Sequence, residues 1–255
     1  MSVTRLYRVD HGGSVRWAAE TDGVWALVEG SPFDEGWRRG PAIVAPTRLL
    51  APVTPTKIVA VGLNYRDHAR ERNKPIPREP MIFLKPPSAV IGPGAPIRLP
   101  PGVGRVDHEA ELGIVIGRRA TRVAPGEAAP YVLGFTCVND VTAREMQDRG
   151  VQYSHCKGFD TFAPAGPAIV IGLDAAALDV EGVVNGTVRQ RSNTRELIFD
   201  VAALVSYISA VMTLEPGDLI ATGTPAGIGP LAPGDTVTVR IEGIGELTNP
   251  VKEHS

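Results

Sequence analysis

Three acidic residues crowd the start of an apolar run in the stretch RVDHEAELGIVIG, residues 105–117. On an extended strand alternate side chains share a face, so Asp107, Glu109 and Glu111 are predicted to point the same way. Carboxylates roughly 6.5 to 7 Å apart along a strand repel one another unless a cation lies between them. Asp140 ends another apolar run, YVLGFTCVND, and offers a further ligand from a neighbouring strand end. This pattern predicts a site for a hard ion such as Mg²⁺ or Mn²⁺.

A base and an acid stand three residues apart in the fragment NYRDHARE. His68 and Glu71 would share one face of a helical turn and could form a hydrogen bond. A histidine oriented by a carboxylate is suited to act as a general base. The competing interpretations are structural: an incidental ion pair on a surface helix for this fragment, and a solvated edge strand for the acidic run.

A substrate carboxylate could be bound just after the acidic strands. The segment DVTAREMQDRG places Thr142 and Glu145 at the spacing of a capping box, which predicts a helix beginning just past Asp140. Arg144 and Gln147 would share a face of that helix, and an arginine with an amide can bind a carboxylate. Alternatively both side chains decorate a solvated helix.

Two further polar groups lie in Gly- and Pro-rich segments. Lys157, in SHCKGFDTFAPAGP, could neutralise a developing oxyanion. The segment ATGTPAGIGPL offers backbone N–H groups and the hydroxyls of Thr222 and Thr224 as a nest for an anion. It lacks the Lys-Ser/Thr ending of a nucleotide loop, so the pattern does not indicate phosphate binding.

Short strands must position these groups, because glycine and proline make up 51 of the 255 residues. The first fifty residues predict a small antiparallel meander with turns at HGG and TDG, followed by a linker over residues 49–57. Only residues 197–214 show helical apolar spacing over a long segment. We therefore predict a small N-terminal β domain, residues 1–52, and a catalytic domain, residues 53–255.

Composition narrows the range of partners. The formal net charge is -2 and the sequence contains no run of basic residues, so we expect no nucleic-acid partner. The amino-terminal residues lack the apolar segment of a signal peptide, and no window has the length of a membrane span. We expect a cytoplasmic protein with no membrane association.

Seven segments, taken in this order, resemble the fumarylacetoacetate hydrolase family: GLNYRDHARE, FLKPPSAVIGPG, DHEAELGIVIG, GFTCVNDVTAREMQ, KGFDTFAPAGP, RQRSNTRELIFDVAALVSYIS and GDLIATGTPAGIGP. The resemblance covers about residues 57–251. It implies an α+β, β-rich fold: a mixed β-sheet roll of the family's C-terminal domain type, with flanking helices, in a homodimer.

The resemblance also implies roles for individual residues. It implies Mg²⁺ or Mn²⁺ on Glu109, Glu111 and Asp140, with Ca²⁺ as a conceivable non-native occupant. It implies a catalytic dyad of His68 and Glu71, Lys157 at the reacting centre, and Arg144, Gln147 and Thr224 around a small 2-oxo acid substrate. The segment 68–80 resembles the family's lid, which orders over bound substrate.

The chain is shorter than the founding member and is similar to the family's compact branch. We expect a divalent-metal-dependent enzyme that acts on small 2-oxo acids or diacids through a metal-bound enolate. Hydrolytic C–C cleavage of an acylpyruvate is the preferred reaction, because the complete His68 and Glu71 pair is what water activation needs. The alternatives are 2-hydroxyhepta-2,4-diene-1,7-dioate isomerase, 5-oxopent-3-ene-1,2,5-tricarboxylate decarboxylase and oxaloacetate decarboxylase. An alternative of another class is a non-catalytic metal-binding module.

Overall fold

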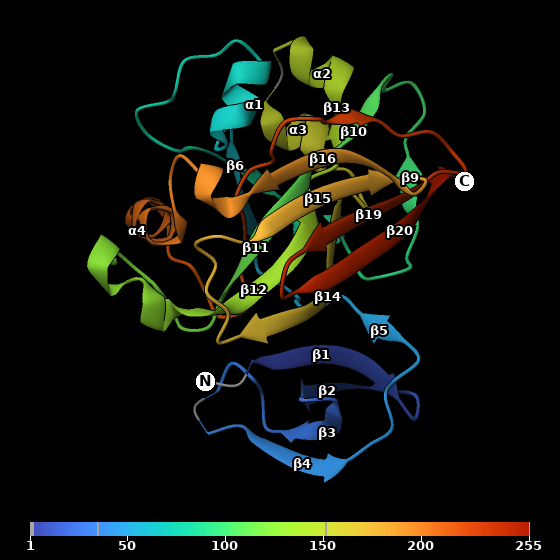
Figure 1. Ribbon diagram of the computed structural model, residues 1–255, viewed down its shortest axis with the longest axis vertical. Coiled ribbons are helices and arrows are strands. Elements are labelled where there is room, and N and C mark those ends of the chain that lie inside the picture. The colour runs from blue at the N-terminus through green and yellow to red at the C-terminus, as the bar shows by residue number, and fades with distance from the viewer. Residues whose placement is uncertain (1–2, 35, 151, 255) are drawn as a thin grey trace.

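Strands dominate this computed structural model, as the glycine- and proline-rich sequence predicts (Figure 1). The structure describes residues 3–34, 36–150 and 152–254. Its main sheet has the order β4 (Arg38–Ala42), β3 (Val24–Glu29), β2 (Ser14–Thr21), β1 (Thr4–His11), β14 (Ala163–Ile171), β12 (Val132–Asn139), β11 (Ala110–Ile116), β17 (Leu219–Ala221), β6 (Ile58–Gly62) and β7 (Met81–Lys85). Two short strands, β5 (Leu49–Leu50) and β8 (Val90–Ile91), pair with β1 and β14.

Two smaller sheets and four α-helices complete the described part of the chain. One sheet has the order β16 (Thr187–Asn193), β15 (Asp179–Val184), β19 (Thr236–Ile241), β20 (Gly245–Glu253) and β9 (Ile97–Leu99), and the other β13 (Thr142–Ala143), β10 (Val106–His108) and β18 (Gly229–Pro230). The α-helices are α1 (Arg66–Glu71), α2 (Arg144–Asp148), α3 (Tyr153–Lys157) and α4 (Val201–Val211). Short 3-10 turns span Pro87–Ala89, Pro125–Glu127, Ala129–Tyr131 and Thr194–Glu196.

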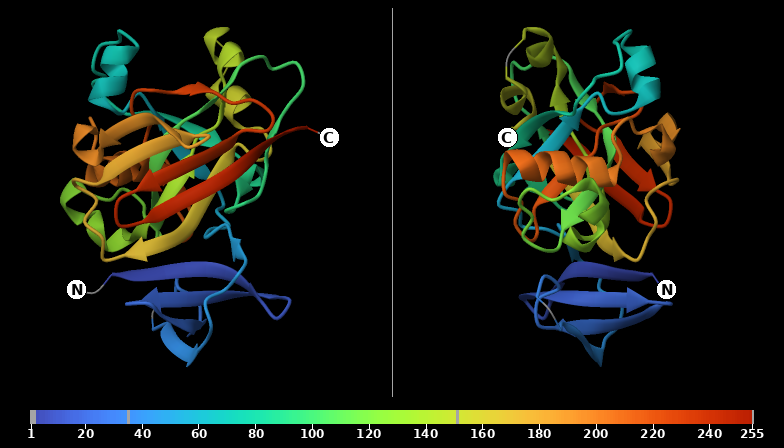
Figure 2. Two further views of the ribbon diagram at one scale, coloured as in Figure 1. Left: turned by 45° about the vertical axis from the view of Figure 1, so that its right-hand side comes forward. Right: turned by 90° about the vertical axis from the view of Figure 1, so that its left-hand side faces the viewer.

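The N-terminal residues form the predicted antiparallel meander, with Gly12-Gly13 and Asp22-Gly23 at two of its turns. The meander joins the main sheet because β1 pairs with β14. The predicted linker begins with β5, which pairs with β1, and has no strand from residue 51 to residue 57. Both views in Figure 2 place β1–β4 at the opposite end of the molecule from α1 and α2.

Strand β11 lies inside the main sheet, between β12 and β17, and all seven of its residues are buried. Side chains from the next strand crowd it so closely that a Cβ on Gly113 would lie 2.6 Å from Val138 Cγ2. It runs antiparallel to β12 and β17, and β17 runs parallel to β6. The start of β11 therefore lies beside the ends of the other three strands, and this edge collects the polar residues that follow them.

The predicted long helix is shorter than the apolar spacing indicates. We predicted it over residues 197–214, and α4 spans Val201–Val211. Asp200 caps it by accepting a hydrogen bond from Ala203 N, and Met212 is already extended. Apolar residues continue past both ends because they pack there in non-helical segments, so periodicity overestimated the length. Leu204, Val205 and Ile208 are buried, as predicted for a core-packed helix.

No helix within the described residues is both long and apolar enough to cross a membrane.

Candidate active site

A cavity of about 290 Å³ opens at the edge where β6, β12 and β17 end. Seven of the nine predicted site residues line it, namely His68, Glu109, Glu111, Arg144, Gln147, Lys157 and Thr224. The other two lie directly behind, because Glu71 hydrogen bonds to His68 and Asp140 to Lys157. A larger cavity of about 700 Å³ beside α4 contains none of the nine. The nine predicted site residues therefore lie together around one cavity.

The three predicted metal ligands form a compact buried group. One carboxylate oxygen from each of Glu109, Glu111 and Asp140 lies within 4.8 Å of the others. Backbone contacts hold the segments together, since Asp140 N donates to Glu109 O at 2.9 Å and Glu109 N to the Asn139 side chain at 2.9 Å. Three converging carboxylates with no sulfur or imidazole among them match the ligand preference of Mg²⁺ and Mn²⁺. These residues fit a hard divalent ion.

Two buried lysines neutralise part of this group. Lys157 Nζ donates to Glu109 Oε2 at 2.8 Å, to Asp140 Oδ2 at 2.5 Å and to Thr142 Oγ1 at 2.7 Å. Lys85 Nζ pairs with the other oxygen of Asp140 and donates to Phe162 O at 2.7 Å. Burial lowers the pKa of Lys85. Burial would lower the pKa of Lys157 as well, but Asp140 and Glu109 raise it above its usual value.

Glu109 and Glu111 experience opposite electrostatic surroundings. Burial alone would raise the pKa of Glu109, but Lys157 and Arg144 hold it well below its usual value. Burial raises the pKa of Glu111, and the neighbouring carboxylates of Asp140 and Glu109 raise it further. Its Oε2 accepts a hydrogen bond from Gly223 N at 2.8 Å. Negative charge is thus least compensated at Glu111, which is where a divalent ion would add the most stabilisation.

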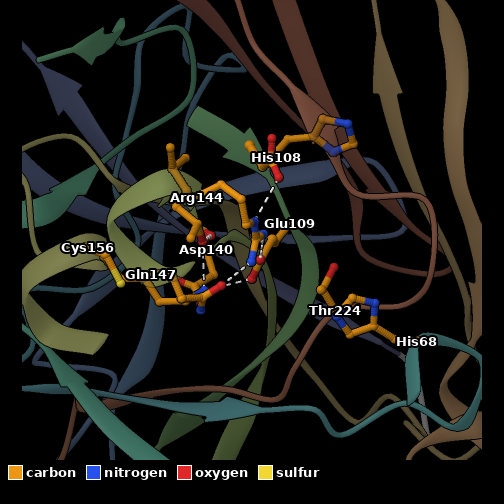
Figure 3. A network of polar contacts seen from close by, with 12 residues as sticks. His68, His108, Glu109, Asp140, Arg144, Gln147, Cys156 and Thr224 are labelled. Atoms are coloured by element: carbon orange, nitrogen blue, oxygen red, sulfur yellow. Dashed lines mark hydrogen bonds and ion pairs between the residues drawn. The ribbon is translucent and has the colours of Figure 1, made fainter. Parts of the chain in front are cut away.

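Arg144 joins the acidic group to Gln147. Its guanidinium donates from Nε to Asp107 Oδ2 at 2.8 Å. It also pairs with Glu109 through Nη2 and with the Gln147 carbonyl through Nη1 (Figure 3). Asp107 is fully buried and also accepts from Arg105 Nε at 2.6 Å. Because Arg144 already has three partners, the amide NH₂ of Gln147 is the better placed of the two to reach a substrate.

The predicted capping box is absent, although α2 does begin just past Asp140. Its N-cap is Ala143, whose side chain makes no capping hydrogen bond. Thr142 Oγ1 instead donates to Asp140 O at 2.8 Å, and Glu145 Oε1 accepts from Arg105 N at 3.0 Å. The prediction was wrong because the threonine is needed at the acidic group, where it also accepts from Lys157.

The predicted hydrogen bond between His68 and Glu71 is present, with 2.7 Å between His68 Nδ1 and Glu71 Oε2. Glu71 Oε1 accepts from Gly227 N at 2.8 Å. Asp67 adds a second attachment for α1, because it accepts from the His68 backbone N–H at 2.6 Å and from Ser192 Oγ at 2.5 Å. Since a carboxylate can only accept, Nδ1 carries a proton, and in the neutral ring Nε2 then keeps a free lone pair.

The loop over residues 222–224 closes the cavity between these two groups. Gly223 has φ +100°, and a Cβ there would lie 2.8 Å from Asn64 Cβ, so both conformation and space require glycine. Its N–H was predicted to contribute to an anion nest, and it donates to Glu111. Thr224 Oγ1 donates to Ala110 O at 2.9 Å, which places its hydroxyl at the start of β11. This N–H of the predicted nest therefore binds a carboxyl group of the protein itself.

Sequence reasoning missed Lys85, although the residue ends an apolar run in FLKPP. Its 2% exposure identifies it as part of the site's charge balance, because such a lysine requires an acidic partner. Its partner Asp140 lies 55 positions away in the sequence. Arg72 and Lys74, which also line the cavity, lie in the lid-like segment 68–80, but no motif singles out either residue.

The fold and the acidic group agree with a family-model match over residues 57–252, described as fumarylacetoacetate (FAA) hydrolase C-terminal. The chain belongs to the fumarylacetoacetate hydrolase family, whose members are enzymes.

The names of similar proteins describe two kinds of reaction, tautomerisation and isomerisation. A mitochondrial oxaloacetate tautomerase of Bos taurus is 45% identical over 79% of this chain and 68% of its own length. The crystal structure of 5-carboxymethyl-2-hydroxymuconate delta-isomerase from Mycobacterium smegmatis is 45% identical, with a TM-score of 0.90, covering 98% of this chain and 100% of its own. That of 2-hydroxyhepta-2,4-diene-1,7-dioate isomerase from Mycobacterium marinum is 44% identical, with a TM-score of 0.90, covering 99% of both chains.

Proposed function

We propose that this protein is a divalent-metal-dependent enzyme that moves a proton on a small 2-oxo acid through an enolate. Its first proposed activity is isomerisation or tautomerisation of a 2-oxo diacid. One observation carries the proposal: an imidazole oriented by a carboxylate faces the same small cavity as three converging buried acids. The names of similar proteins support the choice of reaction, since they include a tautomerase and two isomerases.

Glu109, Glu111 and Asp140 would hold the ion. When bound, a divalent ion would draw electrons from the 2-oxo group and so favour loss of a proton from the adjacent carbon. Gln147 would donate its amide N–H to the substrate carboxylate, beside the hydroxyl of Thr224. Arg72 and Lys74 line the same cavity and could attract a second carboxylate at the far end of the substrate.

His68 would act as the base in this proposal. Its Nε2 removes the proton from the carbon next to the 2-oxo group, and Glu71 stabilises the imidazolium that forms. Returning the proton further along a conjugated chain completes an isomerisation, and moving it between carbon and oxygen completes a tautomerisation. Lys157 holds the pKa of Glu109 below its usual value, and its ammonium group also contacts Asp140.

Hydrolytic cleavage of an acylpyruvate, the reaction preferred from the sequence alone, is the second candidate. The His68–Glu71 hydrogen bond favours it, because the same pair can remove a proton from water. Decarboxylation of oxaloacetate would reach an enolate by loss of CO₂ and would need no base, so it makes the least use of this pair.

The test compares substrates with and without metal. Protein loaded with Mg²⁺ or Mn²⁺, and the same protein after chelation, would be assayed with enol-oxaloacetate, 2-hydroxyhepta-2,4-diene-1,7-dioate and acetylpyruvate. We expect metal-dependent conversion of either enol-oxaloacetate or 2-hydroxyhepta-2,4-diene-1,7-dioate. The change in ultraviolet absorbance measures this conversion. Pyruvate release from acetylpyruvate as the fastest reaction would replace the first candidate with the second. Metal binding without turnover of any of the three would favour the non-catalytic module.

A further inference from the structure

A buried glutamine, Gln190, joins the start of β11, which carries Glu111, to the loop that carries Thr224. Gln190 lies on β16 between two exposed arginines, and its own side chain is fully buried. The opposite residue on β15 is Gly182, where a Cβ would lie 2.6 Å from Gln190 Oε1. The strand pair is also bulged at this point. The chain therefore leaves specific room for this amide.

The orientation of the amide follows from two backbone partners. Gln190 Oε1 accepts from Ala110 N at 2.9 Å, and Nε2 donates to Pro225 O at 2.8 Å. A backbone N–H can only donate and a backbone carbonyl can only accept, so neither end of the amide can be exchanged. Ala110 lies between Glu109 and Glu111, so the acceptor end supports the metal-ligand strand directly.

His108 occupies the second position on the acceptor end. Its Nδ1 lies 3.0 Å from Gln190 Oε1, and since that oxygen is an acceptor, Nδ1 must carry the proton. The ring projects away from the acidic group, to the other side of the strand from Glu109 (Figure 3). The histidine thereby helps to fix the amide without entering the candidate active site.

The donor end of the amide determines the polarity of the hydroxyl of Thr224. Gln190 Nε2 donates to Thr224 Oγ1 at 2.7 Å, so this hydroxyl cannot donate back to Gln190. Its proton must then go to Ala110 O, at 2.9 Å, or to a ligand in the cavity. We propose that Gln190 is a positioning residue: by donating to Thr224 Oγ1 it leaves the hydroxyl proton able to turn from Ala110 O to a substrate carboxylate.

This inference rests on the proposed function, because it assumes that Thr224 contacts substrate. It is tested by binding rather than turnover, with oxalate as a probe of the carboxylate and 2-oxo oxygens. If Mn²⁺-loaded wild-type protein binds oxalate but converts none of the candidate substrates, the proposed function fails. The oxalate affinities of the variants still decide whether Gln190 positions Thr224.

The informative variant is Gln190→Glu, which keeps the shape and the acceptor end but turns the donor end into an acceptor. The hydroxyl of Thr224 would then donate to the new carboxylate and present lone pairs to the ligand. We expect oxalate to bind about ten- to a hundredfold more weakly, the range for losing a hydrogen bond to a charged group. Binding of Mn²⁺ should change by less than about threefold, because Ala110 N keeps its acceptor.

Three further variants test whether Gln190 sets the direction of the Thr224 hydroxyl bond or only supports the fold. Gln190→Met, which removes both ends, should weaken oxalate binding less than Gln190→Glu does, because the hydroxyl can still turn to the ligand. In a Thr224→Val background, Gln190→Glu should have no further effect on oxalate binding. Arg189→Gln, on the exposed side of β16, is the matched control and should bind oxalate as the wild type does.

Calorimetric titration of each purified variant with Mn²⁺, then with oxalate, gives both affinities, and thermal unfolding reports whether each variant folds. The proposal is overturned if Gln190→Glu weakens oxalate binding equally with and without Thr224. It is also overturned if affinity for Mn²⁺ falls in parallel with affinity for oxalate, or if Gln190→Met is the weaker binder. Any of these outcomes would mean that Gln190 only supports the fold.

Discussion

The cavity has two walls that hold their polar groups in different ways. On the wall that includes α2 and α3, Arg144 and Lys157 fix Glu109 and Asp140 through buried ion pairs. On the wall formed by α1 and the loop 222–227, Glu71 orients His68 and is itself held by a backbone N–H. The first wall consists of opposite charges removed from water, and the second of hydrogen bonds at a partly exposed edge.

Because the two walls hold their groups differently, substitutions in them should affect stability and turnover differently. A buried charge that loses its partner destabilises the folded protein strongly, whereas a base that loses its proton acceptor leaves the fold intact. Changes to the first wall should therefore lower both metal binding and the free energy of unfolding. Changes to the second wall should lower turnover alone.

Lys157→Met should have the largest effect. It leaves Glu109 and Asp140 without a shared cation, and we expect the free energy of unfolding to fall by about 3 to 5 kcal/mol, with activity lost. Denaturant unfolding without added metal measures the change. Arg149→Met is the control, because the ion pair of Arg149 with Glu145 is exposed and should contribute less than about 1 kcal/mol. Equal stability of the two variants would contradict the proposed role of the first wall.

His68→Gln should lower kcat/KM by about 10² to 10⁴-fold, the usual contribution of a general base. We expect thermal stability and Mn²⁺ affinity to stay close to the wild-type values, because His68 has no contact with the acidic group among its hydrogen bonds. His155→Gln, an exposed histidine on α3, is the control. Retention of wild-type turnover in His68→Gln would remove the base from the mechanism.

Glu71→Gln should lower kcat/KM by a smaller factor, about 10- to 100-fold. Gly227 N requires an acceptor, so the new carbonyl faces it and the new NH₂ faces His68. His68 Nδ1 would then have to accept, and the proton would move to Nε2, where it blocks proton abstraction. Glu71→Ala is the comparison, because without a partner at Nδ1 the His68 ring can adopt either tautomer. A lower activity for Glu71→Ala than for Glu71→Gln would contradict this tautomer argument.

Ser192→Ala should have the smallest effect, a decrease in kcat/KM of about two- to tenfold. It removes one hydrogen bond from Asp67, which keeps its contact with the backbone N–H of His68. Steady-state kinetics measure the change, with Ser206→Ala on α4 as a variant outside the cavity. A loss as large as that of His68→Gln would show that α1 depends on this single contact.

The positions of the site residues could be predicted from the sequence because alternation along a strand is local. The predicted group of Glu109, Glu111 and Asp140 lies together because each residue follows or begins an apolar strand run. The pair of His68 and Glu71 required only the spacing of one helical turn. The β-rich fold and its mixed sheets followed from the same short runs and from the family resemblance.

What could not be predicted depends on contacts between distant segments. Lys85 reaches Asp140 across the sheet, and Gln190 reaches Thr224 from another sheet, so neither pairing leaves a periodic signal. Thr142 had the spacing of a cap but bonds to Lys157, because a buried ammonium group needs every acceptor nearby. The ends of α4 were missed because apolar residues beyond Asp200 and Val211 pack without helical structure.

The central claim is that His68 and the acidic group carry out enolate chemistry. Its most direct test is the exchange of the C3 hydrogens of pyruvate for deuterium in D₂O, measured by proton NMR. Exchange reports proton removal next to the 2-oxo group whichever reaction the natural substrate undergoes. We predict rapid exchange with Mg²⁺- or Mn²⁺-loaded wild-type protein, loss of exchange after chelation, and at least about a hundredfold slower exchange with His68→Gln. Exchange no faster than in protein-free solution containing the same metal would contradict the assignment of His68 and the acidic group to enolate chemistry.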